Sequence, residues 1–491
     1  MHELVLANEH PRELGLTWYQ RAAAKVSGWL MPSAVKALYD AGRRSKRTRG
    51  WRTNNNSINA ETRRSLPLLR ERSRELHQNH WAAARAKSII QRNVIGGGIV
   101  PTSRDGGDNI YLHDLMRSCD LDPAGRKTMG AIQALALGGV VESGECLIIR
   151  RWRTPGEMRS RGLMSPVQFE VLESDHLDHT VDGPLDDGRF VLQGVEYSRQ
   201  GWPIAYHIRT SHPGDLMRFS QWESVRVPAS EVCHPFIELR PGQARGIPWG
   251  APVLLKMRDL ADYEDAQLQR QKIANAWAVF VHHTDDVRVE ELYDPKGVPQ
   301  SVIPGMVEYL RPGESVEFAN PPSAEGFRDF SEITAQHIAA AYELSYPSLT
   351  GDYGRMNFSA GRMAHVEMQR SITVWQEHLM VAQVCRFFER SIRIAMSLQG
   401  YDPGQSSWKW TPPRREMIDP VKETAATVAA VRAGLNTMPD AITQNGRDVE
   451  DVIEELVAWN TLLDQHGLVL TSDPRKTTDG GQAMPALTEE Q

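Results

Sequence analysis

The sequence predicts an α+β protein with an elongated subunit, and three observations lead to this prediction. Residues 345–399 read as a short loop followed by one helix of about forty residues, longer than most globular helices. Short β-rich runs separated by turns occupy residues 145–233, which is the pattern of an antiparallel sheet. A smaller β-rich stretch at residues 277–318 lies between two helical segments.

The bulk composition is that of a folded, water-exposed protein. With 491 residues, the chain is large enough for two or three domains. Its apolar fraction of 41% and charged fraction of 24% are ordinary for such proteins. No uncharged apolar run approaches the length of about 18 residues that a membrane span needs. The first fifteen residues also lack the basic and apolar segments of a secretory signal. We therefore expect no membrane partner.

The four cysteines predict free thiols. Cys119, Cys146, Cys233 and Cys385 lie far apart and form no CxxC pair. This usage favours buried thiols in a reducing compartment over a disulfide framework.

Charge is distributed unevenly along the chain, although the net charge is only -6. Between Arg43 and Arg74 there are eleven Lys or Arg and two Glu, whereas residues 416–491 contain fourteen acids and five bases. A basic segment rich in Asn and Ser can be a nucleic-acid arm or simply a solvated surface. The sequence leaves both readings open.

The first well-marked elements are helices. One is expected over Glu61–Val94, with a possible kink at Pro67, and a second over Lys127–Leu137, where Gly138 and Gly139 would end it. The antiparallel region follows, with four strands expected at Cys146–Arg150, Val167–Leu172, Arg189–Leu192 and Ile204–Ile208.

The second β-rich region is expected to contain a hairpin. Strands are predicted at Val307–Leu310 and Ser315–Phe318, joined by the turn Arg311–Glu314. Proline and glycine at its two central positions fit a type II turn.

Helical patterns account for most of the remaining chain. The expected helices are Trp249–Ala276, Asp329–Leu344, Ser359–Gln399, Pro420–Ala433 and Val449–Gln465, before a Pro/Gly/Thr-rich tail that we expect to be disordered.

The predicted helix Ser359–Gln399 carries one apolar stripe at three- and four-residue spacing. At ~1.5 Å per residue it would span roughly 60 Å, which suggests a coiled coil, a membrane span or part of an elongated assembly. Its many charged residues exclude the membrane span, and an elongated subunit is favoured. The stripe consists of Ile372, Trp375, Leu379, Ala382, Cys385, Phe388, Ile392 and Ala395.

Residues 253–274 have eight charged side chains, four of each sign, and only a thin apolar stripe. Such a helix fits a position between copies of itself, where neighbours supply complementary ions. A solvent-exposed helix packed weakly on one domain remains the alternative. The segment Ser345–Phe358, with Gly351 and Gly354 as hinges, is either a functional loop on rigid supports or a plain connector.

No catalytic constellation emerges. Gly96–Gly98 follows a helix and lacks the spacing of a phosphate loop, so helix capping explains it better. The pairs His77/His80 and His282/His283 have no carboxylate or cysteine partners at metal-ligand spacing. Asp262, Glu264 and Asp265 are balanced by neighbouring bases, which favours ion pairs over acid–base chemistry. We therefore expect no enzyme activity, no cofactor and no metal.

Five blocks of the sequence resemble the lambda-type family of tailed-phage portal proteins. Together they lie within residues 18–400, and the resemblance weakens over the acidic tail. The most specific block is HPFIELRPGQARGIPWGAPVLLKMRDLADYEDAQLQRQKIANAWAVFV. The other blocks are Leu69–Pro101, Val171–His179, Gly194–Ile208 and Ser345–Gln376.

The resemblance implies a ring, typically of twelve subunits, at one capsid vertex, with double-stranded DNA passing through an axial channel. It divides the chain into a basic N-terminal arm (1–60), wing (61–232), first stem helix (233–276), clip (277–327), second stem helix (328–344), tunnel loop (345–358), long wing helix (359–400), crown helices (401–471) and disordered tail (472–491).

The same likeness assigns residues to roles. The tunnel loop would present Thr350, Asp352, Tyr353, Arg355, Met356 and Asn357 to the DNA. The stem would use Lys256, Arg258, Asp262, Glu264, Arg270 and Lys272 for subunit contacts and channel lining. The clip would use Glu308, Arg311, Glu314 and Glu317 to dock the motor and adaptor.

The implied partners are other copies of the chain, non-specifically bound DNA, the large terminase subunit, a head-completion or adaptor protein, and the major capsid and scaffold proteins. The implied location is the virion, after assembly in the host cytoplasm. Two rival classes are a metal-dependent nuclease, which would need a carboxylate cluster, and a capsid or tail component without a DNA channel.

Overall fold

The computed structural model describes residues 46–47, 49–50, 53, 55–103, 107–215, 224–275, 279–283, 314–318, 326–354, 356–413, 418–447, 449–470 and 475. The chain divides into two compact units, Met1–Ser57 and Ile58–Gln491. The described part of the first unit contains only turns and extended residues, so the elements below belong to the second. Most of the predicted N-terminal arm and tail lie outside the described residues.

Two consecutive helices, α2 (Ile58–Asn79) and α3 (Trp81–Val94), replace the single helix predicted over Glu61–Val94. The break lies at His80, not at Pro67, which lies within α2. His80 has extended backbone angles, and its Nδ1 accepts a hydrogen bond of 3.2 Å from the Ala82 N–H. This side chain therefore caps the start of α3 and ends the continuous helix.

Helix α5 (Met129–Ser143) begins near the predicted start but continues through Gly138 and Gly139, so the predicted end was wrong. The helix ends instead at Gly144, whose φ of 88° lies in the left-handed region. The two internal glycines allow close packing. A Cβ on Gly138 would lie 2.4 Å from Nε2 of Gln91 on α3, and one on Gly139 would lie 3.0 Å from the Cys146 Cβ.

All four predicted strands of the larger β region are present, and their pairing is antiparallel as expected. A three-stranded sheet has the order β3 (Val167–Glu173), β2 (Cys146–Trp152), β9 (Val232–Cys233). A five-stranded sheet runs in sequence order through β4 (Gly183–Pro184), β5 (Phe190–Leu192), β6 (Val195–Tyr197), β7 (Pro203–Arg209) and β8 (Ser224–Pro228).

Strand β2 joins two hydrophobic cores because successive side chains point to opposite faces. Ile148 packs into the main core with the helices, whereas Leu147 and Ile149 pack into a second core with Tyr206 and Ile208 of β7. Strand β9 does the same, with Cys233 in the main core and Val232 in the second, so the three-stranded sheet connects the two cores.

Several short elements were not predicted. Besides β4, β6, β8 and β9, they include β1 (Val100–Thr102), α4 (Asn109–Arg117), α6 (Pro155–Arg161), β12 (Lys409–Thr411), α13 (Met438–Gln444) and single 3₁₀ turns at Ser174–His176, Asp186–Gly188 and Ala229–Glu231. Strands β1 and β12 pair antiparallel and join residues that are about 300 positions apart in the chain.

The long helical run predicted after the loop is confirmed, with one internal difference. Helix α10 (Phe358–Val374) continues into a π-helical segment, Trp375–Cys385, and then into α11 (Arg386–Gln399). Within the π-helical segment, Met380 and Val384 are buried and the predicted stripe residue Ala382 is exposed. Hydrogen bonding from i to i+5 widens each turn, so the buried face moves away from the 3.6-residue spacing.

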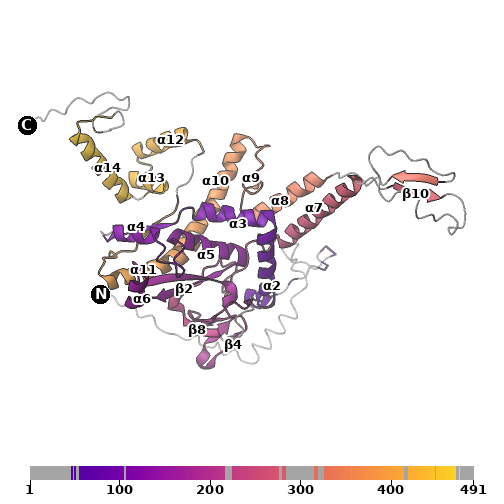
Figure 1. Ribbon diagram of the computed structural model, residues 1–491, viewed down its shortest axis with the longest axis horizontal. Helices are drawn as coiled ribbons and strands as arrows, with labels where there is room; N and C mark the ends of the chain where they lie inside the picture. The colour runs from indigo at the N-terminus through magenta and orange to yellow at the C-terminus, as the bar shows by residue number, and fades with distance from the viewer. Residues whose placement is uncertain are drawn as a thin grey trace, which may run out of the picture. The chain divides into compact units, whose positions relative to one another are not determined.

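Helices α7 (Leu254–Asn275) and α8 (Phe327–Ala341) lie side by side, with strands β10 (Val279–His283) and β11 (Glu314–Phe318) between them in the sequence (Figure 1). The short helix α9 (Tyr346–Thr350) follows α8. The helices predicted near the C-terminus are present as α12 (Pro420–Arg432) and α14 (Val449–Gln465).

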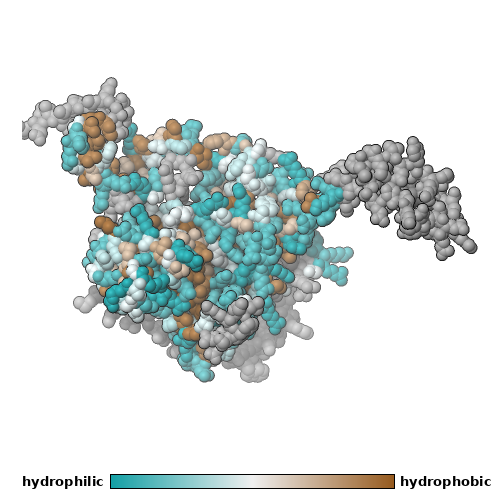
Figure 2. Space-filling view, viewed as in Figure 1, coloured by the Kyte–Doolittle hydropathy of each residue, from teal (hydrophilic) through white to brown (hydrophobic). Residues whose placement is uncertain are grey.

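Helix α14 has exposed apolar side chains, which form brown patches at its position in Figure 2. They include Ile453, Val457 and Trp459, each at least half exposed. Among the described residues, no helix combines the length and apolar character that a membrane span requires.

Candidate functional site

The α7–α8 pair is the first part of the candidate site. Met257 and Leu260 of α7 are buried, as are Ala335 and Ile338 of α8. Farther along, the Tyr263 ring packs edge-on against Phe330, with 4.8 Å between ring centroids. The two helices therefore share one apolar seam.

The predicted stem residues lie away from this seam. Lys256, Arg258, Asp262 and Lys272 are exposed, and Glu264 and Arg270 are half-buried. Lys256 Nζ lies 3.0 Å from His337 Nδ1 on α8, and Arg258 forms an ion pair of 3.1 Å with Asp262 one turn on. Burial, with the neighbouring Asp265, raises the pKa of Glu264. Arg270 and Lys272 form no ion pair with another described residue.

The predicted tunnel loop is shorter than expected, because residues 346–350 form helix α9. Ser345 Oγ accepts a hydrogen bond from the Ser348 N–H at its start, and Gly351, with φ of 79°, ends it. Leu349 is buried, and Arg85 Nε on α3 donates to the Ser348 carbonyl at 3.2 Å. Helix α9 is therefore fixed to the body of the fold, and the described residues 351–354 and 356–357 form a loop between α9 and α10.

Most polar side chains of this loop have structural partners. Thr350 Oγ1 donates to the Tyr346 carbonyl, and Asp352 Oδ1 accepts from the Gly354 N–H at 3.1 Å. Asn357 Oδ1 caps α10 by accepting from the Ala360 N–H at 2.8 Å.

Tyr353 is the exception, because 63% of it is exposed. Met356 is half-buried, and Arg355 lies outside the described residues. The tyrosine side chain is the one most available for an external contact in the described part of the loop.

The predicted clip is described only in part. Strands β10 and β11 pair antiparallel, which places Glu314 opposite His283 and Glu317 opposite Phe280. Glu308, Arg311 and the predicted strand Val307–Leu310 lie outside the described residues.

A buried charge cluster, not predicted from the sequence, lies where the chain approaches α7. Its centre is Glu145, which precedes β2 and is fully buried. Its carboxylate Oε1 accepts from Arg70 of α2 at 2.5 Å and from Arg245 Nε at 2.7 Å. Its Oε2 lies 2.9 Å from His234 Nε2 and accepts from the Gly246 N–H at 2.5 Å.

The two arginines of the Glu145 cluster are also almost completely buried. Burial favours the neutral form of Glu145, but the charges of Arg245, Arg70 and His234 outweigh it and hold its pKa well below the usual range. Burial lowers the pKa of Arg70 to about 10, partly offset by Glu145. The two terminal nitrogens of Arg245 also donate hydrogen bonds to the Gln193 and Ser174 carbonyls. The cluster thus joins α2, both sheets and the segment leading to α7.

Three arginines at the end of the basic segment Arg43–Arg74 form ion pairs within the fold, whereas Arg64 and Arg72 are exposed. Arg63 pairs with Asp182 at 2.8 Å, Arg70 with Glu145, and Arg74 with Asp175 and Glu173. Arg70 and Arg74 are therefore held within the fold, whereas the side chain of Arg63 remains 61% exposed.

The histidines and cysteines considered above have structural positions. His77 Nδ1 contacts the Ser73 carbonyl, and burial lowers the pKa of its ring. The side chains of His282 and His283 are outside the description. All four cysteines are free thiols; three are buried and Cys119 is half-buried.

One group of possible metal ligands occurs among the described residues, formed by Glu173, Asp175 and His212. Arg74 contacts both carboxylates, so the negative charge that would attract a cation is already compensated. We assign no metal site to it.

Comparison with known proteins gives a family and several relatives. The family model described as phage portal protein, lambda family, matches residues 44–376. The probable portal protein of Halomonas phage phiHAP-1 is 25% identical over 461 residues, covering 85% of each chain. Portal protein B of Escherichia phage lambda is 20% identical over 466 residues, covering 83% of this chain and 86% of its own.

Solved structures give weaker matches. A chain from the neck of an empty gene transfer agent particle aligns with a TM-score of 0.47 at 16% identity, over 78% of this chain and 94% of its own. An HK97-family phage portal protein from Corynebacterium diphtheriae aligns with a TM-score of 0.32 at 13% identity, over 70% and 95%.

Proposed function

This chain belongs to the lambda family of phage portal proteins, and we propose that copies of it form a ring, typically of twelve, around a channel for double-stranded DNA. The ring would stand at one capsid vertex, admit DNA during packaging, retain it and release it at ejection. The chain itself would act as a conduit without catalysing a reaction.

The α7–α8 pair carries this proposal. Its apolar seam is narrow, and several large apolar side chains remain outside it: Leu255 is 73% exposed and Ile333 is 51% exposed. Neighbouring copies around a ring would cover such side chains and would bring charged residues of opposite sign together. An isolated subunit leaves these surfaces in water, which is the less favourable state.

Weak attraction to DNA would suit a channel through which DNA must slide. Each phosphate that Lys or Arg neutralises releases counterions and strengthens binding, so many unpaired cations would hold DNA in place. Residues 253–274 carry equal numbers of acids and bases, which keeps the attraction low. Tyr353, Arg355 and other tunnel-loop residues would touch the DNA backbone briefly, without reading the bases.

The remaining partners are assigned to other surfaces. The hairpin region around Glu314 and Glu317 would meet the large terminase subunit and later a head-completion protein. Capsid and scaffold proteins would bind the outer parts of the ring, and assembly would take place in the host cytoplasm.

An in vitro packaging reaction tests the function. Procapsids of the parent phage assembled with this chain should take up DNase-resistant DNA when terminase and ATP are added. Procapsids assembled without it should take up none. Equal DNA uptake by both preparations would contradict the proposal.

A further inference from the structure

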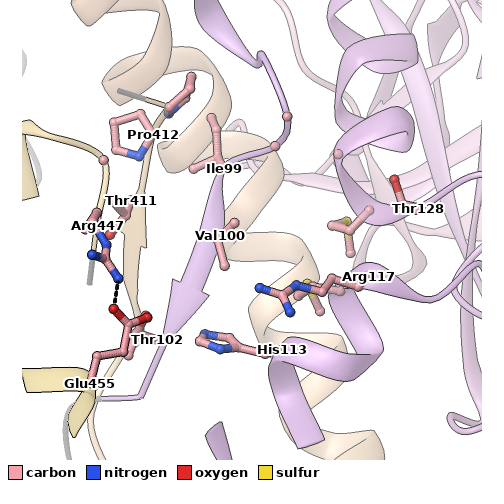
Figure 3. Close-up of a pocket in the computed structure, with 17 residues that line it drawn as sticks. Ile99, Val100, Thr102, His113, Arg117, Thr128, Thr411, Pro412, Arg447 and Glu455 are labelled. Atoms are coloured by element: carbon pink, nitrogen blue, oxygen red, sulfur yellow. Dashed lines mark hydrogen bonds and ion pairs between the residues drawn. The ribbon is translucent and has the colours of Figure 1, made fainter. Parts of the chain in front are cut away.

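A pocket of about 500 Å³ lies between α4, the start of α5, the β1–β12 pair and the loop that joins α13 to α14 (Figure 3). Val100 and Met116 are among its apolar lining residues, and His113, Arg117 and Thr411 are among the polar ones. Its volume lies within the range of about 300–1,000 Å³ that is usual for small-molecule sites.

Two buried hydrogen-bonding atoms of the pocket-lining residues have no partner among the described residues. Thr411 is only 6% exposed, yet its Oγ1 makes no hydrogen bond. His113 Nε2 is also buried without a partner. Arg117 forms no ion pair with a described residue, and Figure 3 shows its side chain between His113 and Thr128. Buried polar atoms normally find partners, so Thr411 Oγ1 and His113 Nε2 indicate a missing ligand, whereas Arg117 is exposed and adds a positive charge at the pocket.

The electrostatics of the pocket favour an anion. Helix α5 begins there, after the cap residue Thr128, and its first-turn residues Met129 and Gly130 line the pocket. The start of a 15-residue helix carries partial positive charge and unpaired N–H groups. The one carboxylate among the lining residues, Glu455, is paired with Arg447 at 2.5 Å. The polar lining groups that remain without a partner in the described part of the chain are the cation Arg117 and the neutral side chains of His113 and Thr411.

We propose that this pocket binds a phosphate-bearing ligand of nucleotide size. Arg117, His113 and Thr411 would donate to the phosphate oxygens, while the sugar would pack on Val100 and Met116. The phosphate comes either from a free nucleotide or from DNA. The inference does not depend on the proposed channel, since the binding groups belong to one subunit.

Isothermal titration of the full-length protein with dAMP, and separately with a short DNA duplex, tests the proposal. Arg117→Gln should weaken dAMP binding about tenfold, because it removes a charge-assisted hydrogen bond. Thr411→Val should weaken it severalfold with little change in side-chain shape. Arg126→Gln removes the same charge from an exposed arginine outside the pocket and should leave binding unchanged.

The two ligands distinguish the source of the phosphate. Loss of dAMP binding alone in Arg117→Gln supports a free nucleotide, and a matching loss of duplex binding supports DNA. The proposal is overturned if the wild type binds neither ligand, or if Arg117→Gln binds both as tightly as Arg126→Gln. Thermal melting of each variant shows whether the fold is retained, and Arg117 is exposed, so its replacement should not disturb it.

Discussion

At the scale of single residues, Glu145 is the centre of the buried charge cluster that joins distant parts of the fold. Its carboxylate is shared by Arg70, Arg245 and His234, which come from three separate parts of the chain. Removing one member of a buried ion group leaves the others charged and unpaired, and this costs about 3–5 kcal/mol. The cluster is therefore sensitive to any neutral replacement at its centre.

Glu145→Gln should lower the free energy of unfolding by about 3–5 kcal/mol, measured by urea denaturation. Glu71→Gln, at an exposed position beside Arg70 on α2, is the matched control and should change stability by less than about 0.5 kcal/mol. If the two variants were equally stable, the buried charge of Glu145 would contribute no more to stability than the exposed charge of Glu71.

The same cluster predicts a pH dependence. The pKa of Glu145 in the folded protein lies well below its ordinary value of 4.5. Its stabilising effect is therefore complete above pH 4.5 and is lost as the pH falls below that value, because the unfolded chain binds the proton first. Below pH 4.5, the unfolding free energy of wild type should fall more steeply with acid than that of Glu145→Gln. Parallel curves would contradict this.

Replacing Gly144 tests the close contact between its backbone and that of Ile247, next to the Glu145 cluster. Its φ is 88°, and a Cβ there would lie 2.3 Å from the Ile247 carbonyl carbon. Gly162 has a similar φ of 66° but open space around it. By urea denaturation, Gly162→Ala should cost about 1 kcal/mol for its backbone conformation alone, and Gly144→Ala several kcal/mol more. Similar costs for the two variants would show that the contact is unimportant.

The sequence did not reveal this cluster, and the reason is physical. Arg70 and Glu145 are 75 positions apart, and each has the composition of an ordinary surface charge. Only the packing of α2 against α5, which ends just before Glu145, brings them together. By contrast, the i,i+4 pair Arg258–Asp262 was predictable, because helix geometry alone places its partners together.

At the scale of elements, helices and strands whose apolar residues recur at regular spacing were predictable. Elements that depart from that spacing were not. The helix Ser359–Gln399 was found within one residue of its start, but the π-helical turns moved Ala382 out of the buried stripe. The sequence pattern predicts a helix end at Gly138 and Gly139, but α5 continues through them, because they pack tightly against Gln91 and Cys146 in a tertiary contact that the pattern does not contain.

The tunnel loop gives a prediction at this scale. Shortening residues 351–357 should reduce DNA packaging or retention and leave ring assembly intact, because α9 and α10 have their own caps and packing. Packaged DNA can be measured as the DNase-resistant fraction, and assembly by electron microscopy. A variant in which Asp352–Met356 is replaced by Gly and Ser, at full length, separates side-chain contacts from loop length. Normal packaging by the shortened variant would remove the loop from the mechanism.

At the scale of the whole molecule, the order of the described regions was predictable from the sequence: helices, an antiparallel sheet, a helix, a short β region, a second helix and then the long helical run. The predicted hairpin strand Val307–Leu310 lies outside the described residues and stays a prediction. The neighbours that would cover the exposed apolar side chains of α7 and α8 were not predictable. The sequence of a self-association surface does not encode the number of subunits in the assembly. The pocket at Arg117 was also missed, because it joins residues that lie more than 300 positions apart.

Electron microscopy of the purified protein tests the central claim most directly. If copies of this chain surround a channel, the images should show closed rings with a central hole wide enough for one DNA duplex. A compact monomer without a hole, at every concentration and also inside assembled particles, would contradict the account.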